Sequence, residues 1–482
     1  MSVVIVGNGM AGHRLAQGLR RRSADLPVTV LGAEPCPAYN RVLLSSVLAG
    51  TSTAEALELA GSAVEVRLGA RVVGLDTRAR RVTFDDDTQL GYRDLVLATG
   101  SRAAIPPVEG LAGPDGAPAE GVVTFRTLAD CERITELARR GPMAVLGGGL
   151  LGVEAARGLA GLGVDVTVVH PVGHLMERQL DPGGGAVLAG VLGGLGVRFR
   201  LSIGAARWQP GRLELTDGSV LDVAGVVVSA GVAPQTWLAR SAGLRVERGI
   251  VVDDRMATSA PGVHAIGECA EHRGRCHGLV GPCWEQADTL ADLLTGADRN
   301  ARYTGSALVT RLKARDVDLA AMGELPGEDA EVVRVEDPAR GRYGALSLRE
   351  GRIAGAVLLG LPEATGPVTQ LYDTGAPAPA DRFALLLGRA LGAVTESPAQ
   401  LPARAVVCNC NGVTKRELVG AWRDGARNRQ ALAATTRATT GCGSCADAVD
   451  GLCSWLAESD PAPESDPAPE DDLVPAEREG AA

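Results

Sequence analysis

The chain contains two copies of a pattern in which a short apolar strand runs into a glycine-rich turn and then into a helix. In the first copy, residues 3–6 lead into GNGMAG, and apolar residues recur at helical spacing over 15–19. A second strand over 28–32 is followed by an acidic residue. This arrangement is typical of a dinucleotide site, because glycines let the backbone approach a pyrophosphate and the carboxylate binds ribose hydroxyls. The predicted binding residues are Gly7, Gly9, Gly12 and Glu34; the alternative is an unliganded turn.

The second copy covers residues 143–170 and again predicts a strand, a G-x-G-x-x-G turn, a helix and a strand. Its glycines are Gly147, Gly149 and Gly152. The second strand ends in His170 rather than in an acid. An acid there would favour a free 2′-hydroxyl and a nearby cation would tolerate a 2′-phosphate, so His170 leaves the choice open between NADH and NADPH. A capping histidine is the alternative reading of this residue.

Four cysteines near the C-terminus have the spacing C-x-C-x31-C-x2-C, namely Cys408, Cys410, Cys442 and Cys445. Sets of this kind hold iron–sulfur clusters or structural zinc, and ligand spacing alone does not distinguish the two. Thr414 and Glu417 form a capping-box pattern that predicts a helix beginning just after Cys410. We expect Cys453 to be a buried helical cysteine rather than a ligand.

Charge and hydropathy limit the classes of partner. The net charge is −10, but residues 456–482 hold nine acidic residues and one basic residue, so the rest of the chain is close to neutral. No basic block suggests a nucleic-acid partner. No apolar run is long enough to cross a membrane, and no secretory signal is visible. Ten cysteines without such a signal predict the cytoplasm, where clustered cysteines more often bind metal.

The two fingerprints, with A-T-G at residues 98–100 between them and a Gly-acid pair at residues 267–268, resemble the two-dinucleotide-binding flavoprotein family. The resemblance covers residues 1–300 and implies FAD at the first fingerprint and NAD(P)H at the second. It implies FAD contacts for the first-fingerprint residues and for Arg41, Thr99, Gly100, Gly267 and Glu268. The family more often has Asp at the last position, and Glu can serve as the same acceptor.

For Glu154, just after the second fingerprint, the resemblance implies a place near the nicotinamide. The alternative is an acid in the first turn of a helix, where it would favour the helix dipole. No cysteine pair in the flavin domain has C-x-x-C or C-x4-C spacing, so a disulfide relay is not expected. We expect Cys36 to be incidental, and Cys269, Cys276 and Cys283 to be scattered core thiols.

A closer resemblance extends over nearly the whole chain except the tail. The stretches GNGMAGHR, EPCPAYNRVLLSSVLAG, LMERQLDP and HAIGECAEHRGRCHGLV are similar to the N-terminal half of NAD(P)H-dependent nitrite reductases. They are equally similar to the electron-transfer subunits of assimilatory nitrate reductases. CNCNGVTKREL with TGCGSC resembles the bacterioferritin-associated-ferredoxin-like [2Fe–2S] domain. The resemblance therefore implies FAD, NAD(P)H and a [2Fe–2S] cluster.

The predicted fold class is α/β, with two Rossmann-like domains of glutathione-reductase type, a small α+β third domain and a small helical [2Fe–2S] domain. The short strands of residues 302–390 and a helix around 381–391 make up the third domain. The expected parts are 1–121 and 246–300 for FAD, 122–245 for NAD(P)H, 301–390 for the third domain, 391–404 for a linker, 405–456 for the cluster domain and 457–482 for a disordered acidic tail.

The predicted function is electron transfer from NAD(P)H through FAD and the cluster to a separate molybdenum nitrate reductase, or to a separate nitrite reductase. The nitrite reductases that the chain resembles continue into a siroheme domain with four further cysteines, whereas here only Cys453 follows Cys445. We therefore expect nitrite or nitrate to be reduced on a separate protein. One alternative is a ferredoxin- or rubredoxin-type reductase that serves an oxygenase. Another is a redox-sensing protein that binds nucleotides without turnover. NADH is the favoured reductant, because no Arg directly follows His170. The sequence does not decide whether the chain forms a homodimer.

Overall fold

The computed structural model describes residues 2–323, 330–389, 401–403, 405–408, 411–440 and 445–460. The chain divides into two compact units, Met1–Thr395 and Glu396–Ala482. Most of the predicted linker and tail lie outside the described residues. The tail was predicted to begin at residue 457, but the last helix continues to Ser459, so the start of this prediction is wrong by about one helical turn.

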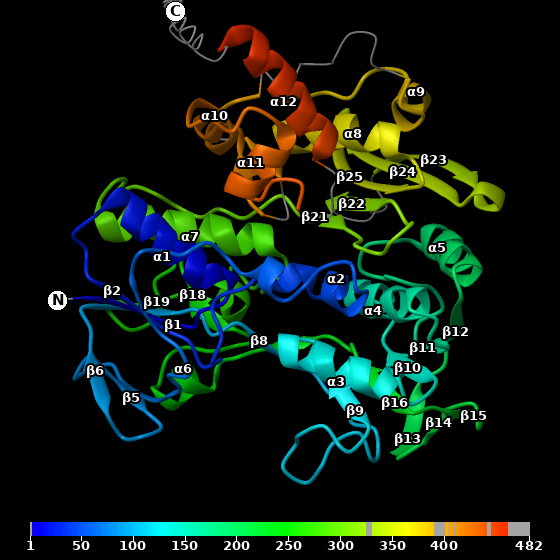
Figure 1. Ribbon diagram of the computed structural model, residues 1–482, viewed down its shortest axis with the longest axis horizontal. Coiled ribbons are helices and arrows are strands. Elements are labelled where there is room, and N and C mark those ends of the chain that lie inside the picture. The colour runs from blue at the N-terminus through cyan, green and yellow to red at the C-terminus, as the bar shows by residue number, and fades with distance from the viewer. Residues whose placement is uncertain are drawn as a thin grey trace, which may run out of the picture. The chain divides into compact units, whose positions relative to one another are not determined.

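A parallel five-stranded sheet lies at the centre of the first half of the larger unit (Figure 1). The first strand is buried on both faces, as expected for β-branched residues in the middle of a parallel sheet. The strand order is β19 (Val263–Ala265), β7 (Asp94–Leu97), β1 (Val3–Val6), β2 (Val28–Leu31) and β3 (Glu65–Arg67). The predicted strand–turn–helix–strand unit is therefore confirmed, and β19 returns to the sheet from far along the chain.

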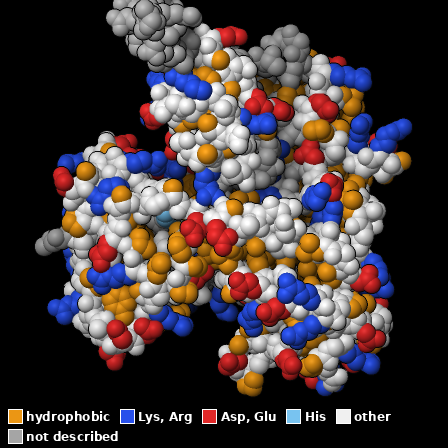
Figure 2. Space-filling view, viewed as in Figure 1, with side chains coloured by type: hydrophobic (Ala, Val, Ile, Leu, Met, Phe, Trp, Pro, Cys, Tyr) orange, Lys and Arg blue, Asp and Glu red, His pale blue; other side chains and the backbone are white. Residues whose placement is uncertain are grey.

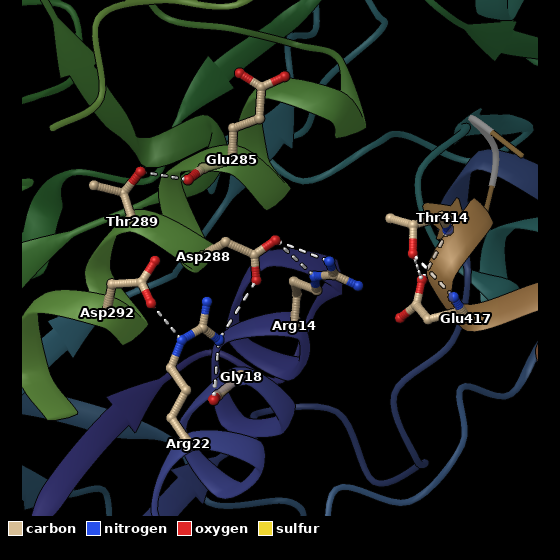
Figure 3. Close-up of polar contacts among 9 residues, drawn as sticks. All are labelled: Arg14, Gly18, Arg22, Glu285, Asp288, Thr289, Asp292, Thr414 and Glu417. Carbon is tan, nitrogen blue, oxygen red and sulfur yellow. Dashed lines mark hydrogen bonds and ion pairs between the residues drawn. The ribbon is translucent and has the colours of Figure 1, made fainter. Parts of the chain in front are cut away.

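Helix α1 (Met10–Arg22) follows the first glycine-rich turn and packs beside helix α7 (Val280–Thr295) (Figure 1). Its apolar face, which includes Leu15 and Leu19, is fully buried. On the other side, Arg14 Nη2 lies 2.8 Å from Asp288 Oδ2, and the ion pairs of Arg22 with α7 are drawn in Figure 3. These contacts fix the direction of α1 and hence the position of its N-terminus.

A second parallel sheet repeats the arrangement around helix α4 (Leu150–Gly161). Its order is β12 (Val197–Leu201), β11 (Val166–His170), β10 (Met143–Leu146), β16 (Gly225–Val228) and β9 (Val122–Thr124). The chain enters and leaves this region through an antiparallel pair, β8 (Ser101–Ala103) with β17 (Val232–Pro234). The second nucleotide fold is thus inserted into the first.

The third sheet is antiparallel, with the order β21 (Val309–Arg311), β22 (Leu319–Gly323), β25 (Arg352–Leu359), β24 (Arg342–Arg349) and β23 (Glu331–Asp337). Alternate residues face opposite sides. Leu319 and Ala321 join the core beneath the second sheet, whereas Ala320 and Met322 pack in a separate core with helix α8 (Pro362–Thr374). Helix α8 was not predicted. The helix expected around 381–391 is α9 (Arg382–Leu386), and it is shorter than predicted.

The other elements of the larger unit connect these layers. The helices are α2 (Leu44–Leu48), α3 (Leu128–Ala138), α5 (Pro182–Gly194) and α6 (Trp237–Ser241). The 3-10 turns are Arg41–Leu43, Glu55–Leu57, Gly267–Cys269 and Pro338–Arg340. The small sheets are β4 (Val72–Asp76) with β5 (Arg81–Phe84) and β6 (Gln89–Gly91), β13 (Ala205–Gln209) with β14 (Arg212–Leu215) and β15 (Val220–Asp222), and β18 (Ile250–Val252) with β20 (Ala270–His272).

The smaller unit is mainly helical, as predicted. It contains a strand pair, β26 (Val406–Cys408) with β27 (Val413–Thr414), and the helices α10 (Lys415–Arg423), α11 (Arg429–Thr436) and α12 (Ala446–Ser459). Leu418, Leu432 and Leu452 are fully buried in one shared core. A core this small provides only a low free energy of unfolding, so each helix cap and any bound metal matters for folding.

The surface of the described residues carries charges of both signs. On the face drawn in Figure 2, basic and acidic side chains are interspersed. Among the residues with a described position, no helix combines the length and apolar character needed to cross a membrane.

The capping box predicted from the sequence is present at the start of α10. The Thr414 hydroxyl accepts a hydrogen bond from Glu417 N–H, and the Glu417 carboxylate accepts one from Thr414 N–H, at 3.3 and 2.8 Å (Figure 3). The prediction of a helix just after Cys410 is therefore confirmed, since α10 begins at Lys415.

We expect Thr414→Ala to destabilise α10 by about 1 kcal/mol, because it leaves an N-terminal amide of the helix without its cap. Hydrogen–deuterium exchange of the full chain should show exchange of residues 415–423 accelerated by about fivefold. Thr414→Ser retains the acceptor and should exchange at the wild-type rate. Equal protection of α10 in the Ala variant and the wild type would show that the cap does not limit the opening of this helix.

Candidate functional site

The first glycine-rich turn brings strand β1 and helix α1 into close contact. Gly7 has φ +117°, and a Cβ atom there would lie 2.1 Å from the Ala98 carbonyl oxygen. A Cβ atom on Gly12 would lie 2.0 Å from the Gly7 carbonyl oxygen. Gly9 differs, since its nearest neighbour would be Arg41 Nε at 3.9 Å. It is the N-cap of α1 and gives no side-chain cap, so the first N–H groups of the helix have no capping side chain and can bind an anion such as a pyrophosphate.

The acid at the end of this nucleotide fold belongs to a small polar cluster. Glu34 forms an ion pair with Arg41 and accepts a hydrogen bond of 2.9 Å from the Tyr39 hydroxyl. Arg41 also donates to the Tyr39 hydroxyl at 2.7 Å and stacks on its ring. The structure therefore brings Glu34, Arg41 and Gly9 together, so that both a carboxylate and a guanidinium flank the turn.

A second polar group lies where β7 and β19 end. Glu268 Oε2 accepts a 2.6 Å hydrogen bond from the Ser101 hydroxyl and forms an ion pair with Arg126. The preceding Gly267 has φ +78°, and a Cβ atom there would lie 2.9 Å from the Ala11 side chain in α1. Glu268 is thus held beside the first turn of the helix that carries the first fingerprint.

The A-T-G segment lies at the junction of the two nucleotide folds. The Thr99 hydroxyl donates to the Gln235 carbonyl at 2.8 Å, and Gln235 N–H donates to the Gly100 carbonyl at 2.9 Å. Gly100 has φ +67°, a conformation that glycine adopts readily. These bonds tie the end of β7 to the strand that returns from the inserted fold.

Arg126 is a site residue that the sequence did not reveal. Its partner Glu268 is 142 residues away in the chain. One local signal was available, because Thr127 and Asp130 form a capping box that marks the start of α3 directly after Arg126. That signal places Arg126 directly before the start of a helix, although it does not identify the carboxylate that the guanidinium meets.

The second turn repeats the geometry of the first. Gly147 has the same φ of +117°, with a hypothetical Cβ atom 2.3 Å from the Ser229 carbonyl oxygen. A Cβ atom on Gly152 would lie 2.0 Å from the Gly147 carbonyl oxygen, and one on Gly149 would meet nothing within 4 Å. Gly149 is the uncapped N-cap of α4. This turn therefore also fits the pyrophosphate of a dinucleotide.

Glu154 and Arg157 connect this helix to the third sheet domain. The Glu154 side chain is buried, and its Oε1 accepts a 2.8 Å hydrogen bond from Lys313 N–H. Arg157 donates to the Arg315 carbonyl and to Asp316, at 3.0 and 2.7 Å. Because α4 begins at Leu150, Glu154 lies beyond the first turn, and the reading as a first-turn acid is wrong.

His170 ends strand β11 and is buried. Its Nε2 lies 3.2 Å from Glu177 Oε2. The side chain is therefore paired with a carboxylate that the sequence analysis did not consider.

Two of the four predicted cluster ligands belong to the described residues. Cys408 and Cys445 are buried in the smaller unit, whereas Cys410 and Cys442 lie outside the described residues. The Asn411 amide nitrogen lies 3.9 Å from Cys408 Sγ and also donates to the Arg437 carbonyl at 2.7 Å. Hydrogen bonds to sulfur tune the potential of iron–sulfur centres, so this contact fits a cluster ligand. Cys453 lies on α12, where it is partly rather than fully buried.

The thiols described in the larger unit have raised pKa values and are therefore poor nucleophiles at neutral pH. Burial raises the pKa of Cys131 to about 12, and burial also raises the pKa of Cys269 and Cys283. The Cys36 thiol is partly exposed, and its pKa is raised by desolvation and by the nearby Glu34 carboxylate. Raised pKa values leave little thiolate at neutral pH, and thiolate is the reactive form.

Three family models match the chain. Pyridine nucleotide-disulphide oxidoreductase covers residues 1–287, the rubredoxin NAD+ reductase C-terminal domain covers 309–364, and the BFD-like [2Fe-2S] binding domain covers 406–454. The first implies FAD and a nicotinamide nucleotide, and the last implies a [2Fe–2S] cluster. These are the cofactors predicted from the sequence.

Two relatives from Bacillus subtilis (strain 168) match 95% of the chain. One is a nitrite reductase [NAD(P)H], 35% identical, and the other is an assimilatory nitrate reductase electron transfer subunit, 33% identical. The chain spans only 58% and 60% of their lengths. Among solved structures, the covalent putidaredoxin reductase–putidaredoxin complex matches with a TM-score of 0.71 and 26% identity, over 78% of this chain and 94% of that one.

The resemblance and the fold class predicted from the sequence are therefore confirmed. A nucleotide fold inserted into another, an antiparallel third domain and a helical C-terminal unit occur in one chain, and a single family model covers more than half of its length. The chain belongs to the pyridine nucleotide-disulphide oxidoreductase family, with a BFD-like [2Fe-2S] binding domain added at its C-terminal side.

Proposed function

We propose that the chain carries electrons from NAD(P)H, through FAD and a [2Fe–2S] cluster, to a separate catalytic subunit that reduces nitrate or, as the second choice, nitrite. The observation that carries this proposal is the pair of matching open turns at Gly9 and Gly149, together with a cysteine-bearing unit in the same chain. The printed name of the electron transfer subunit from Bacillus subtilis supports the choice of partner.

The roles of the residues follow from their positions. FAD bound at the first turn would accept hydride and release single electrons. The N–H groups at Gly9 would hold its pyrophosphate, Glu34 would accept from ribose hydroxyls, and Arg41 would offset the phosphate charge. Thr99 and Gly100 would hold the backbone beside FAD, while Gly267 and Glu268 would contact its ribityl chain.

The second turn would bind the nicotinamide nucleotide through Gly147, Gly149 and Gly152. Glu154 would lie near the nicotinamide, where its bond to Lys313 N–H would keep the carboxylate fixed. His170 would face the adenosine side. No side chain has to transfer a proton to carry out a hydride step, so the residues that matter for this reaction bind and orient.

Cys408, Cys410, Cys442 and Cys445 would hold the cluster, with Asn411 donating to one sulfur. In this proposal, residues 1–121 and 246–300 bind FAD, residues 122–245 bind the nicotinamide nucleotide, and residues 405–456 hold the cluster. We also propose that the chain acts in the cytoplasm, where clustered cysteines more often bind metal than form disulfides.

A ferredoxin- or rubredoxin-type reductase is the alternative function. The match of residues 309–364 to a rubredoxin reductase domain and the likeness to putidaredoxin reductase favour it. The built-in cysteine unit favours the first proposal, since a reductase that carries its own cluster has less need of a free ferredoxin.

An anaerobic titration of the purified chain with NADH, and then with NADPH, tests the proposal. We expect rapid bleaching of the flavin absorption, followed by the EPR signal of a reduced [2Fe–2S] centre. Reduction of an added nitrate reductase would then identify the partner. Bleaching without a cluster signal, with zinc found by metal analysis, would leave a plain flavin reductase, and an absence of bleaching with either nucleotide would reject turnover altogether.

A further inference from the structure

A carboxylate stands at the end of β11 although the strand itself ends in histidine. The Glu177 carboxylate comes from the loop after the strand and lies 3.2 Å from His170 Nε2. The Glu177 side chain is 34% exposed, whereas that of His170 is 6% exposed. The imidazole therefore forms a buried support under an acid that reaches the surface.

The loop is shaped so as to return Glu177 to this place. Met176 N–H donates to the Gly148 carbonyl at 2.9 Å, and the Met176 carbonyl accepts from Gln179 and Leu180 at 2.8 Å. Met176 is fully buried and has φ +53°, a conformation that costs energy for a residue with a side chain. The fixed Met176 holds the next residue directly beside the second fingerprint.

The histidine is equally fixed. A Cβ atom on Gly148 would lie 2.8 Å from His170 Cγ, so the ring lies against the middle of the fingerprint turn. A carboxylate only accepts hydrogen bonds, which places the proton of the ring on Nε2. His170 Nδ1 is buried and has no hydrogen-bond partner among the described residues, so a charged ring would bury an unsatisfied N–H.

We propose that Glu177, positioned by His170, binds the 2′-hydroxyl of the adenosine ribose and makes the second site selective for NADH over NADPH. This inference rests on the proposed function only in assigning the second turn to the nicotinamide nucleotide. A carboxylate accepts from a free 2′-hydroxyl and repels a 2′-phosphate. The following residue, Arg178, lines a cavity together with Asp181 and Thr310. Glu177 thus supplies, from seven residues downstream, the acid that is missing at the strand end.

Binding to the full, FAD-loaded chain provides the first test. Isothermal titration calorimetry with ADP-ribose and with 2′-phospho-ADP-ribose measures selectivity without any redox step. We expect the wild type to prefer ADP-ribose and Glu177→Gln to reduce the ratio of the two affinities by about tenfold or more, since a charge-assisted hydrogen bond is lost and a repulsion removed. The matched control is Asp165→Asn, which removes the same charge from an exposed position at the other end of β11.

The role of His170 is tested by rescue. His170→Ala should lower the same ratio, and His170→Gln, which retains an N–H donor near the Nε2 position, should restore most of it. Each ratio is internal to one protein, so a general loss of stability does not imitate the effect. The ratio of kcat/KM for NADH and NADPH in flavin reduction should change in parallel.

The outcomes separate the two proposals. Selective binding of ADP-ribose with no flavin bleaching would keep the role of Glu177 and reject the proposed function. Flavin reduction with an unchanged ratio in Glu177→Gln would keep the function and overturn the role of Glu177. A wild type that binds neither probe, or that prefers the 2′-phosphate, would also overturn it.

Discussion

Cys408→Ser is expected to abolish the [2Fe–2S] centre while leaving the flavin reaction intact. Cys408 is buried in the core of the smaller unit, at the end of strand β26. An alcohol oxygen there is a much poorer iron ligand than a thiolate. The iron content and the EPR signal of the reduced protein should fall by about tenfold or more, since even the loss of residues that support metal ligands costs 10- to 100-fold.

The flavin provides the internal control for this variant. Reduction of 2,6-dichlorophenolindophenol, a dye that accepts electrons from a flavin, should continue at the wild-type rate because both fingerprints belong to the other unit. Electron delivery to a nitrate reductase should be lost. Cys453→Ser, in the same unit but outside the predicted ligand set, should retain iron and both activities. A Cys408→Ser protein with a full EPR signal would remove this residue from the ligand set.

Local patterns made several features predictable from the sequence. The glycine spacing predicted two turns that prove to share a φ of +117° and the same 2.0 Å approach between the third glycine and the first. Thr414 and Glu417 predicted the start of α10, because a capping box is completed within four residues. Each of these features is determined by side chains that are close in the chain.

Helix α8 shows why other features were missed. It contains Gly366 and Pro367 near its middle, and both residues disfavour helix in isolation. The helix forms because Ala364, Val368 and Leu371 are buried against one face of the third sheet. Tertiary packing overrides local preference here, and that packing is invisible before the sheet is known.

The same limit applies to the site. Arg126 meets Glu268 across 142 residues, which no local pattern encodes. Glu177 is only seven residues from His170, yet their contact depends on the positive φ of Met176, which a methionine does not signal. The sequence therefore indicated where an acid was missing at the second site, and only the loop conformation shows which residue takes its place.

Gly12→Ala and Gly152→Ala are expected to divide the reaction into its two halves. In both variants the new methyl group would lie 2.0 Å from the carbonyl oxygen of the first glycine of its turn, an obstacle made of backbone. The helix must therefore move away from its strand, at a cost of about 1–3 kcal/mol or more. The helix N-terminus moves with it, so the pyrophosphate site is lost together with the packing.

The two variants should fail differently because each clash lies in a different nucleotide fold. Gly12→Ala should be purified without FAD and with a lower melting temperature. Gly152→Ala should keep its FAD absorption but bind ADP-ribose more weakly by about tenfold or more.

Gly190→Ala is the matched control: this glycine is exposed on α5 with nothing within 4 Å of a Cβ atom, so alanine there should be neutral or stabilising by up to about 1 kcal/mol. Loss of FAD from Gly152→Ala with full FAD in Gly12→Ala would reverse the assignment of the two sites. The outcome matters beyond these glycines, since the order of the two sites decides which fold binds the hydride donor and which one holds the flavin that accepts the hydride and passes electrons on.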